Sequence, residues 1–194
     1  MRHDAFVAGK LCNLRPVEIG DASFINEIRG DPSLTRYLHK VSGKLADQEK
    51  WLQSYFDREN DYYFIIEDRE NRRPVGTIGL YDIDLANNNG EWGRWLLAPG
   101  SLFATESALL IYRFALDVLK LDGVFCRTVS DNKQVVSFHE SCGLEQTGIL
   151  KGFHELGDRT CDAVEHKLTK ERWRGVEPHL SRIVGRLSSR RKVS

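Results

Sequence analysis

Segments with strand character alternate with segments with helix character along most of the chain, and this order is the strongest constraint on its fold. Residues 62–66 read YYFII, a run of aromatic and β-branched side chains that is typical of a strand. Residues 104–119 instead repeat apolar side chains at the spacing of one helix face. This alternation predicts an α/β fold, in which helices cover the faces of a mixed sheet.

Proline, glycine and asparagine divide the chain into these segments. The first helix ends before Asp31-Pro32, because a residue that precedes proline disfavours the helical region. The turn at residues 87–90 (NNNG) joins two antiparallel strands. The expected strands are residues 11–16, 62–66, 75–84, 91–97, 124–129, 145–153 and 160–168. The expected helices, which complete the order β-α-α-β-β-β-α-β-α-β-β, are residues 21–30, 45–58, 104–119 and 132–142.

The composition changes near the C-terminal end of the sequence. Residues 1–173 show no internal repeat or long linker and suit a single domain of ordinary size. Residues 174–194 hold five Arg and one Lys against a single Glu, with no aromatic side chain. This composition predicts a basic tail or an accessory helix rather than a core element.

Charge and hydropathy disfavour several classes of function. Lys and Arg number 28 and Asp and Glu number 28, so the formal net charge at pH 7 is zero. Proteins whose main partner is nucleic acid or an anionic membrane are usually basic. The sequence has no apolar run of about 18 residues that could span a bilayer, and its first residues lack the apolar stretch of a signal peptide. We therefore expect a cytoplasmic protein with no nucleic-acid and no membrane partner.

The spacing of cysteine and histidine predicts neither a disulfide framework nor a metal site. The four cysteines are widely scattered, form no CxxC pair and suit buried free thiols in a reducing compartment. The histidines form no metal-binding spacing with acidic or thiol partners, so no metal is expected.

A strand, a Pro-Gly-Ser loop and a helix follow one another at residues 94–106. The N–H groups in the first turn of a helix lack partners within the helix, and the positive end of the helix dipole favours anions. The junction therefore suits a pyrophosphate group. Most junctions of this kind bind nothing, however, and Glu106 also suits simple capping of the helix.

Four motifs run through the chain between about Leu11 and Leu168. They are Leu14-Arg15-Pro16 followed by Asp21, the stretch PVGTIG at residues 74–79, Ala104-Thr105-Glu106, and the segment from Asn132 to Gly143-Leu144. Together they resemble the GNAT superfamily of acyl-CoA N-acyltransferases. The resemblance implies that two parallel strands, residues 91–97 and 124–129, splay apart around the pantetheine of acetyl-CoA. The residues that it implies for contact with this cosubstrate are Leu96, Leu97, Ser101, Phe103, Ala104, Thr105 and Asn132.

The loop before the long helix departs from the usual pattern of the superfamily. That pattern is Arg/Gln-x-x-Gly-x-Gly/Ala, whereas this chain has Pro99 at the first position and Leu102 at the first glycine. Ala104 is retained. Leu102 restricts close approach to the backbone, and Gly100 and Ser101 provide flexibility one or two residues earlier.

Within the superfamily, the chain most resembles bacterial nucleotide-sugar amine acetyltransferases, such as those acting on UDP-4-amino sugars in pseudaminic-acid synthesis. The stretches that carry this likeness are residues 28–32, 37–38, 47–51, 62–66 and 90–93. Arg29 and Trp51 match those enzymes and are expected to bind the substrate. Gly30 and Gln48 stand where those enzymes have Asn and His. Tyr81 is a further candidate, stacking on a sugar or base, although aromatic residues in strands usually belong to the core.

Acetyl transfer to an amine needs a group that takes a proton from the ammonium, since only the free amine attacks a thioester. Glu91 lies on the strand that would line the cleft, and we predict that it is this base; a solvent-facing hairpin residue is the alternative. His139 occupies the helix position where many members of the superfamily have a tyrosine that protonates the departing sulfur. We predict that His139 is this acid near neutral pH, with roles as the base or as a packing residue left open. Cys142 is interpreted as a packing residue rather than a nucleophile.

The sequence therefore predicts a cytoplasmic N-acetyltransferase that moves an acetyl group from acetyl-CoA to a primary amine, with a nucleotide-linked amino sugar as the first choice. Two alternatives stay open: a protein N-terminal acetyltransferase of the ribosomal-protein type, and a module that binds acyl-CoA without turnover. An exposed edge strand would also allow two copies to pair as a homodimer, although nothing in the sequence requires it.

Overall fold

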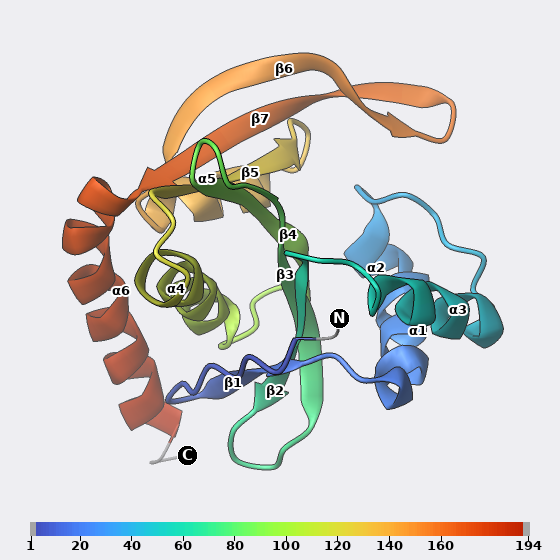
Figure 1. Cartoon of the computed structure of the whole chain (residues 1–194), viewed down its shortest axis with the longest axis horizontal. Helices are drawn as coiled ribbons and strands as arrows, with labels where there is room; N and C mark the ends of the chain where they lie inside the picture. Colours follow the sequence, from blue (N-terminus) through green and yellow to red (C-terminus); the bar gives the residue numbers. More distant parts are fainter. Residues whose placement is uncertain (1–2, 192–194) are drawn as a thin grey trace.

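The computed structural model describes residues 3–191, and its main elements follow the predicted order (Figure 1). The strands are β1 (Cys12–Pro16), β2 (Tyr62–Asp68), β3 (Pro74–Asp84), β4 (Asn89–Leu97), β5 (Gly123–Val129), β6 (Glu145–Leu156) and β7 (Arg159–Thr169). The helices are α1 (Ala22–Gly30), α2 (Pro32–Thr35), α3 (Leu45–Tyr55), α4 (Ala104–Arg113), α5 (Lys133–Ser141) and α6 (Lys170–Arg191). A π-helical turn continues α4, and the short helix α2 is an element that the sequence does not predict.

The strands form one mixed sheet in the order β1-β2-β3-β4-β5-β7-β6, which confirms the predicted fold class. Only β4 and β5 are parallel among the pairs within residues 3–191. Their ladder spans three residue pairs, from Asn89–Gly123 to Glu91–Phe125. Beyond Glu91, β4 follows β3 to its end while β5 follows β7. The two parallel strands therefore splay apart, as predicted.

Helices cover both faces of the sheet because β2 is apolar on both sides. Figure 1 shows α4 and α6 on one side of the central strands, and α1, α2 and α3 on the other. Alternate residues of β2 enter the two cores: Phe64 and Ile66 pack on the α4 side, whereas Tyr63 and Ile65 pack on the side of α1 and α3. This two-sided burial explains the unbroken apolar run at residues 62–66.

Helix α6 packs along α4 and contains most of the C-terminal segment whose composition predicts a basic tail or accessory helix. Trp173, Leu180 and Val184 are buried and belong to the same core as α4. Their spacing places them on one helix face, which residue counts alone do not reveal. Trp173 Nε1 also donates to Asp117 Oδ1 at 3.0 Å. The boundary expected after residue 173 therefore falls inside a packed helix, and residues 192–194 lie outside the described residues.

Glu106, in the first turn of α4, binds the start of β1 instead of capping its own helix. Its side chain is buried, with the residue 1% exposed. The carboxylate accepts the backbone N–H groups of Lys10, Leu11 and Cys12 at 2.6, 2.5 and 2.8 Å. Hydrogen bonds to an ionised acceptor are stronger than neutral ones. The Glu106 side chain therefore attaches the start of the edge strand β1 to helix α4.

The four cysteines are free thiols. Within residues 3–191, no group of three or more His, Cys, Asp or Glu side chains is arranged to hold a metal ion. None of the helices in this range combines the length and the apolar character needed to cross a bilayer.

Candidate active site

A β-bulge bends β4 three residues beyond Glu91, its last residue to pair with β5. In the register with β3, Arg94 and Trp95 together face the single residue Ile78. Arg94 has a φ of 49°, and its carbonyl accepts the Thr77 hydroxyl at 2.8 Å. A bulged strand bends and twists more than a regular strand. The bulge, which the sequence does not predict, therefore explains why β4 and β5 part after Glu91.

Glu91 lies where the splay begins, as the last residue of β4 that pairs with β5. The residue is 9% exposed, and its Oε2 accepts a hydrogen bond from Arg127 Nη1 at 2.9 Å. Burial raises the pKa of Glu91 to about 7 despite the opposing effect of Arg127, and the carboxylates of Asp82 and Glu165 add to the rise. A carboxylate whose pKa lies near the working pH suits a general base. The structure thus buries Glu91 instead of exposing it as a hairpin residue.

The residues expected to contact acetyl-CoA begin along the far half of β4. Leu96 is buried and Leu97 is half-buried at the end of this strand. A Cβ on Gly76 would clash with the Leu96 carbonyl oxygen and lie 2.6 Å from Leu97 Cδ2, so glycine lets β3 approach β4 closely. Trp95 Nε1 donates to Ser107 Oγ at 3.1 Å, which fixes the end of β4 against α4.

The loop between β4 and α4 makes its turn at Gly100, which has a left-handed φ of 73°. The Ser101 N–H donates to the Ala98 carbonyl at 3.0 Å, and the Ser101 carbonyl accepts the Ala104 N–H at 3.2 Å. Thr105 then lies in the first turn of α4, whose N–H groups lack partners within the helix. This loop and helix start therefore fit a diphosphate group, although residue 102 is not glycine.

Phe103 and Asn132, the other residues expected to contact the cosubstrate, have structural contacts of their own. Phe103 is buried, and the Arg191 guanidinium lies 5.4 Å from the centre of its ring. The Asn132 side-chain oxygen accepts the Val135 N–H at 3.4 Å and so caps α5. Their contacts with acetyl-CoA stay predictions.

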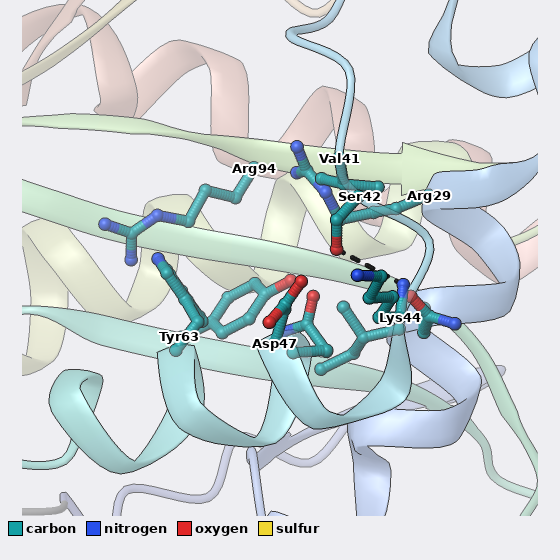
Figure 2. A pocket seen from close by; sticks show the side chains of 11 residues that line it. Arg29, Val41, Ser42, Lys44, Asp47, Tyr63 and Arg94 are labelled. Carbon is teal, nitrogen blue, oxygen red and sulfur yellow. Dashed lines mark hydrogen bonds between the residues drawn. The ribbon is translucent and has the colours of Figure 1, made fainter.

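A cavity of about 470 Å³ lies on the α1 and α3 side of the sheet and brings together two of the three residues expected to bind the substrate (Figure 2). Arg29 from α1 and Trp51 from α3 both line it. The charged side chains Lys44, Asp47 and Arg94 also line it, together with the uncharged polar side chains Asn26, Ser42 and Gln48. Figure 2 shows Arg94 on one side of the cavity and Arg29 and Lys44 on the other.

Tyr81, the third candidate for substrate binding, lies behind this lining and connects it to Glu91. The Arg94 guanidinium pairs with both carboxylate oxygens of Asp61 and lies 4.4 Å from the centre of the Tyr81 ring. Tyr81 faces Glu91 directly across the β3–β4 ladder. A Cβ on Gly93 would clash with the Tyr81 hydroxyl, so glycine lets this ring lie against β4. The stacked side chains of Arg94 and Tyr81 thus connect the cavity lining to Glu91.

His139 lies inside the core, with the residue 3% exposed. Its ring centre is 5.0 Å from that of Trp92 and 5.5 Å from that of His166. Burial lowers the pKa of His139 to about 3, and His166 adds to this effect. The imidazole is therefore neutral at pH 7, which does not favour the expected role of His139 as a proton donor near neutral pH. Any catalytic role stays a prediction. Burial also raises the pKa of Cys142 to about 12, so this thiol is protonated at pH 7.

We expect His139→Phe to make folding less sensitive to acid. Below the usual histidine pKa of about 6.5, the unfolded chain takes up a proton that the folded chain takes up only near pH 3, so stability falls as the pH falls. This difference removes about 2 kcal/mol of unfolding free energy from the wild-type protein between pH 7 and pH 5. Phenylalanine keeps the ring contacts without the titration. Urea unfolding over this pH range measures the difference.

His179, exposed on α6, gives the control variant His179→Gln for this comparison. An identical pH dependence in His139→Phe and wild type would contradict the buried, neutral state of His139. The same variant tests the role predicted from the sequence, since full turnover at pH 7 would show that His139 is not the acid.

Comparison with known proteins gives one family and several solved structures. The family model of the Acetyltransferase (GNAT) domain matches residues 12–145. The structure of apo FdhC, a nucleotide-linked sugar GNAT, is 27% identical, with 94% of this chain and 99% of that chain covered and a TM-score of 0.78. A mutant of the spermidine N-acetyltransferase SpeG from Vibrio cholerae is 19% identical, with 85% and 97% covered and a TM-score of 0.73, which shows similarity of fold alone. No curated protein matches the chain.

Proposed function

Because the chain belongs to the GNAT acetyltransferase family and is an acyl-CoA-dependent N-acetyltransferase, we propose that it acetylates the amine of a nucleotide-linked amino sugar. The charge of the cavity carries this choice of acceptor. Three basic side chains and one carboxylate line it, namely Arg29, Lys44, Arg94 and Asp47. Asp61 neutralises Arg94 from outside the lining, so Arg29 and Lys44 against Asp47 leave one net positive charge to meet a diphosphate. Such a lining attracts phosphate groups and repels a polycation.

Aromatic rings in and beside the cavity offer a surface to the sugar or base of such a substrate. Trp51 stacks on Tyr55 with the ring centres 5.7 Å apart, and Tyr63 meets Trp51 edge-on at the same distance. Stacking of a base on an aromatic side chain contributes about 1–3 kcal/mol. The likeness to a nucleotide-linked sugar GNAT supports the same class of substrate.

Acetyl-CoA supplies the acetyl thioester when it is bound. The splay after Glu91 leaves the far half of β4 unpaired on the β5 side, which fits a pantetheine chain beside Leu96 and Leu97. The first turn of α4, which contains Thr105, would hold the diphosphate.

Removal of the amine proton is the step that this chain performs with Glu91. The carboxylate, which is about half ionised near pH 7, accepts a proton from the substrate ammonium. The free amine attacks the acetyl carbon, a nitrogen–carbon bond forms, the carbon–sulfur bond breaks and coenzyme A leaves as the thiolate. The second proton of the nitrogen passes to solvent water as the amide forms. Since His139 is buried and neutral, we assign protonation of the sulfur to water.

Incubation of the protein with acetyl-CoA and a panel of amines tests the proposal, with release of free thiol as the readout. The panel contains UDP- and dTDP-linked amino sugars, spermidine, and peptides with free α-amines. We expect thiol release with at least one nucleotide-linked amino sugar and only background with spermidine. Acetylation of peptides alone would select an N-terminal protein acetyltransferase. Stabilisation by acetyl-CoA without thiol release would select a binding module, and either result contradicts the proposal.

Arg29→Ala is expected to raise the KM for the nucleotide-linked amino sugar about 10–100-fold and to leave the KM for acetyl-CoA unchanged. The reason is the loss of a charged hydrogen bond to phosphate, which contributes about 1.5–3 kcal/mol, with tenfold in affinity for each 1.4 kcal/mol. Arg29→Lys keeps the charge and is expected to show a smaller rise. Gln53→Ala, at an exposed position of α3, is the control. An unchanged KM for the sugar in Arg29→Ala would exclude this cavity as the acceptor site.

A further inference from the structure

Four polar side chains form a continuous row across neighbouring strands, beginning at Glu91. Arg127 on β5 donates from Nη1 to Glu91 Oε2 at 2.9 Å and from Nε to Glu165 Oε2 on β7 at 3.1 Å. The hydroxyl of Thr147 on β6 donates to Glu165 Oε1 at 3.0 Å. The sheet order β4-β5-β7-β6 places these side chains next to one another, and Arg127 and Glu165 are direct partners in the ladder.

Two aromatic rings also hold the Arg127 guanidinium. Its central carbon lies 4.7 Å from the centre of the Phe125 ring and 5.1 Å from that of the Phe153 ring. Phe125 is itself the residue that pairs with Glu91 at the last step of the β4–β5 ladder. Two rings and two carboxylates therefore fix the guanidinium beside the base. Phe153 and Glu165 both belong to the β6–β7 hairpin, so this hairpin contributes to the geometry of the site.

We propose that Arg127 is a positioning residue for Glu91: it holds the carboxylate where β4 and β5 part and favours its ionised form, while Glu165 fixes Arg127 in turn. This inference rests on the proposed function, since it takes Glu91 as the base. Arg127 acts through the carboxylate of Glu91, and Glu165 opposes it as a second negative charge.

The groups that face Glu91 have opposite effects on its proton affinity. Burial is the largest influence and raises the pKa of Glu91, Arg127 lowers it, and Asp82 on β3 and Glu165 on β7 raise it. Two further titratable groups that interact with Glu91 have raised pKa values and are protonated at neutral pH, namely Tyr81 and Cys126. Without Arg127, the buried carboxylate keeps its proton to a higher pH. Without the charge of Glu165, it releases its proton at a lower pH.

The acidic limb of the kcat/KM profile tests the proposal, measured with whichever amine of the panel is acetylated. Arg127→Gln is expected to move this limb to higher pH by about 1 unit, the usual effect of losing one opposite charge. The rate at pH 7 then falls about fivefold and recovers at pH 9. Glu165→Gln is expected to move the limb to lower pH. Arg127→Lys, which keeps the charge, is expected to lie between Arg127→Gln and wild type. A purely structural defect would lower the rate by the same factor at every pH.

A titration that needs no turnover separates this proposal from the proposed function. The side-chain carboxyl of Glu91 is followed by NMR in the full chain labelled with carbon-13 glutamate, and its signal is assigned by its loss in Glu91→Gln. We expect a higher pKa for Glu91 in Arg127→Gln, a lower one in Glu165→Gln and no change in Glu155→Gln, whose site is exposed on β6. These shifts without sugar acetylation would support the role of Arg127 and reject the substrate class. An unchanged Glu91 titration in Arg127→Gln, or shifts of the same sign in Arg127→Gln and Glu165→Gln, would overturn the proposal.

Discussion

Glu91→Gln is expected to lower kcat by about 10²–10⁴-fold, the usual range for the loss of one general base. Glutamine has almost the same shape, and its side-chain oxygen can still accept the hydrogen bond from Arg127 that Glu91 accepts at 2.9 Å. It cannot take a proton from an ammonium at neutral pH. Steady-state kinetics at saturating acetyl-CoA and amine measure the loss. Calorimetry is expected to give an unchanged Kd for acetyl-CoA.

The pH profile of the wild-type enzyme provides the comparison for this variant. Because the pKa of Glu91 is about 7 and the base works in its ionised form, kcat/KM is expected to fall as the pH decreases below 7 and to level off above it. The residual activity of Glu91→Gln is expected to lack this limb. Glu155→Gln, at an exposed position, is expected to behave as wild type. Full activity in Glu91→Gln would remove Glu91 from the mechanism.

Glu106→Ala is expected to lower the free energy of unfolding by about 3–6 kcal/mol, a large share of the roughly 5–15 kcal/mol that holds a typical domain together. The carboxylate of Glu106 is the acceptor for the N–H groups of Lys10, Leu11 and Cys12. Each buried N–H group that loses its acceptor costs about 1–3 kcal/mol, and the missing side chain also leaves a cavity. Urea unfolding followed by tryptophan fluorescence measures the change.

Two matched variants show whether this loss comes from the acceptor. Glu106→Gln keeps the volume and one acceptor oxygen, so about half of the loss is expected. Thr105→Ala changes the neighbouring residue of the same helical turn, which is half-buried, and is expected to cost less than about 1 kcal/mol. If Glu106→Ala proved as stable as wild type, the three N–H groups would have other acceptors in the folded chain.

Much of the fold follows from local pattern. The aromatic and β-branched run at residues 62–66 predicts the strand β2, and the structure places alternate residues of it in two separate cores. The NNNG turn predicts the hairpin of β3 and β4, and the parallel pair splays as predicted. Two features of the fold cannot be predicted from the local sequence pattern. The bulge depends on how β4 aligns with Ile78 of β3. The buried face of α6 consists of three apolar residues in a segment that is rich in arginine, so the composition of the segment does not indicate this face.

The candidate site is less predictable because its chemistry is set by distant segments. The position of Glu91 is clear from the sequence, but its burial and raised pKa come from strands that meet only in the fold. Arg127 and Glu165 lie 36 and 74 residues further along the chain. The charged residue Arg127 inside the predicted strand at residues 124–129, which is otherwise mostly apolar, is the signal that could have pointed to a carboxylate partner. For His139, the resemblance to the superfamily indicates a catalytic position, but the surroundings of the side chain do not follow from the sequence. Trp92 and His166, which are distant in the chain, pack against its ring and help to bury it.

Deleting one residue from the Arg94–Trp95 pair would leave one residue of β4 opposite Ile78, with Gly93 still facing Gly79 and Leu96 still facing Thr77. The bend would disappear with the extra residue. The opening between the parallel strands is thus encoded by the length of one strand more than by the identity of its side chains. Among relatives of this chain, point mutations in this stretch are expected to be common and single-residue insertions or deletions rare, which makes residue spacing the first property to compare across the family.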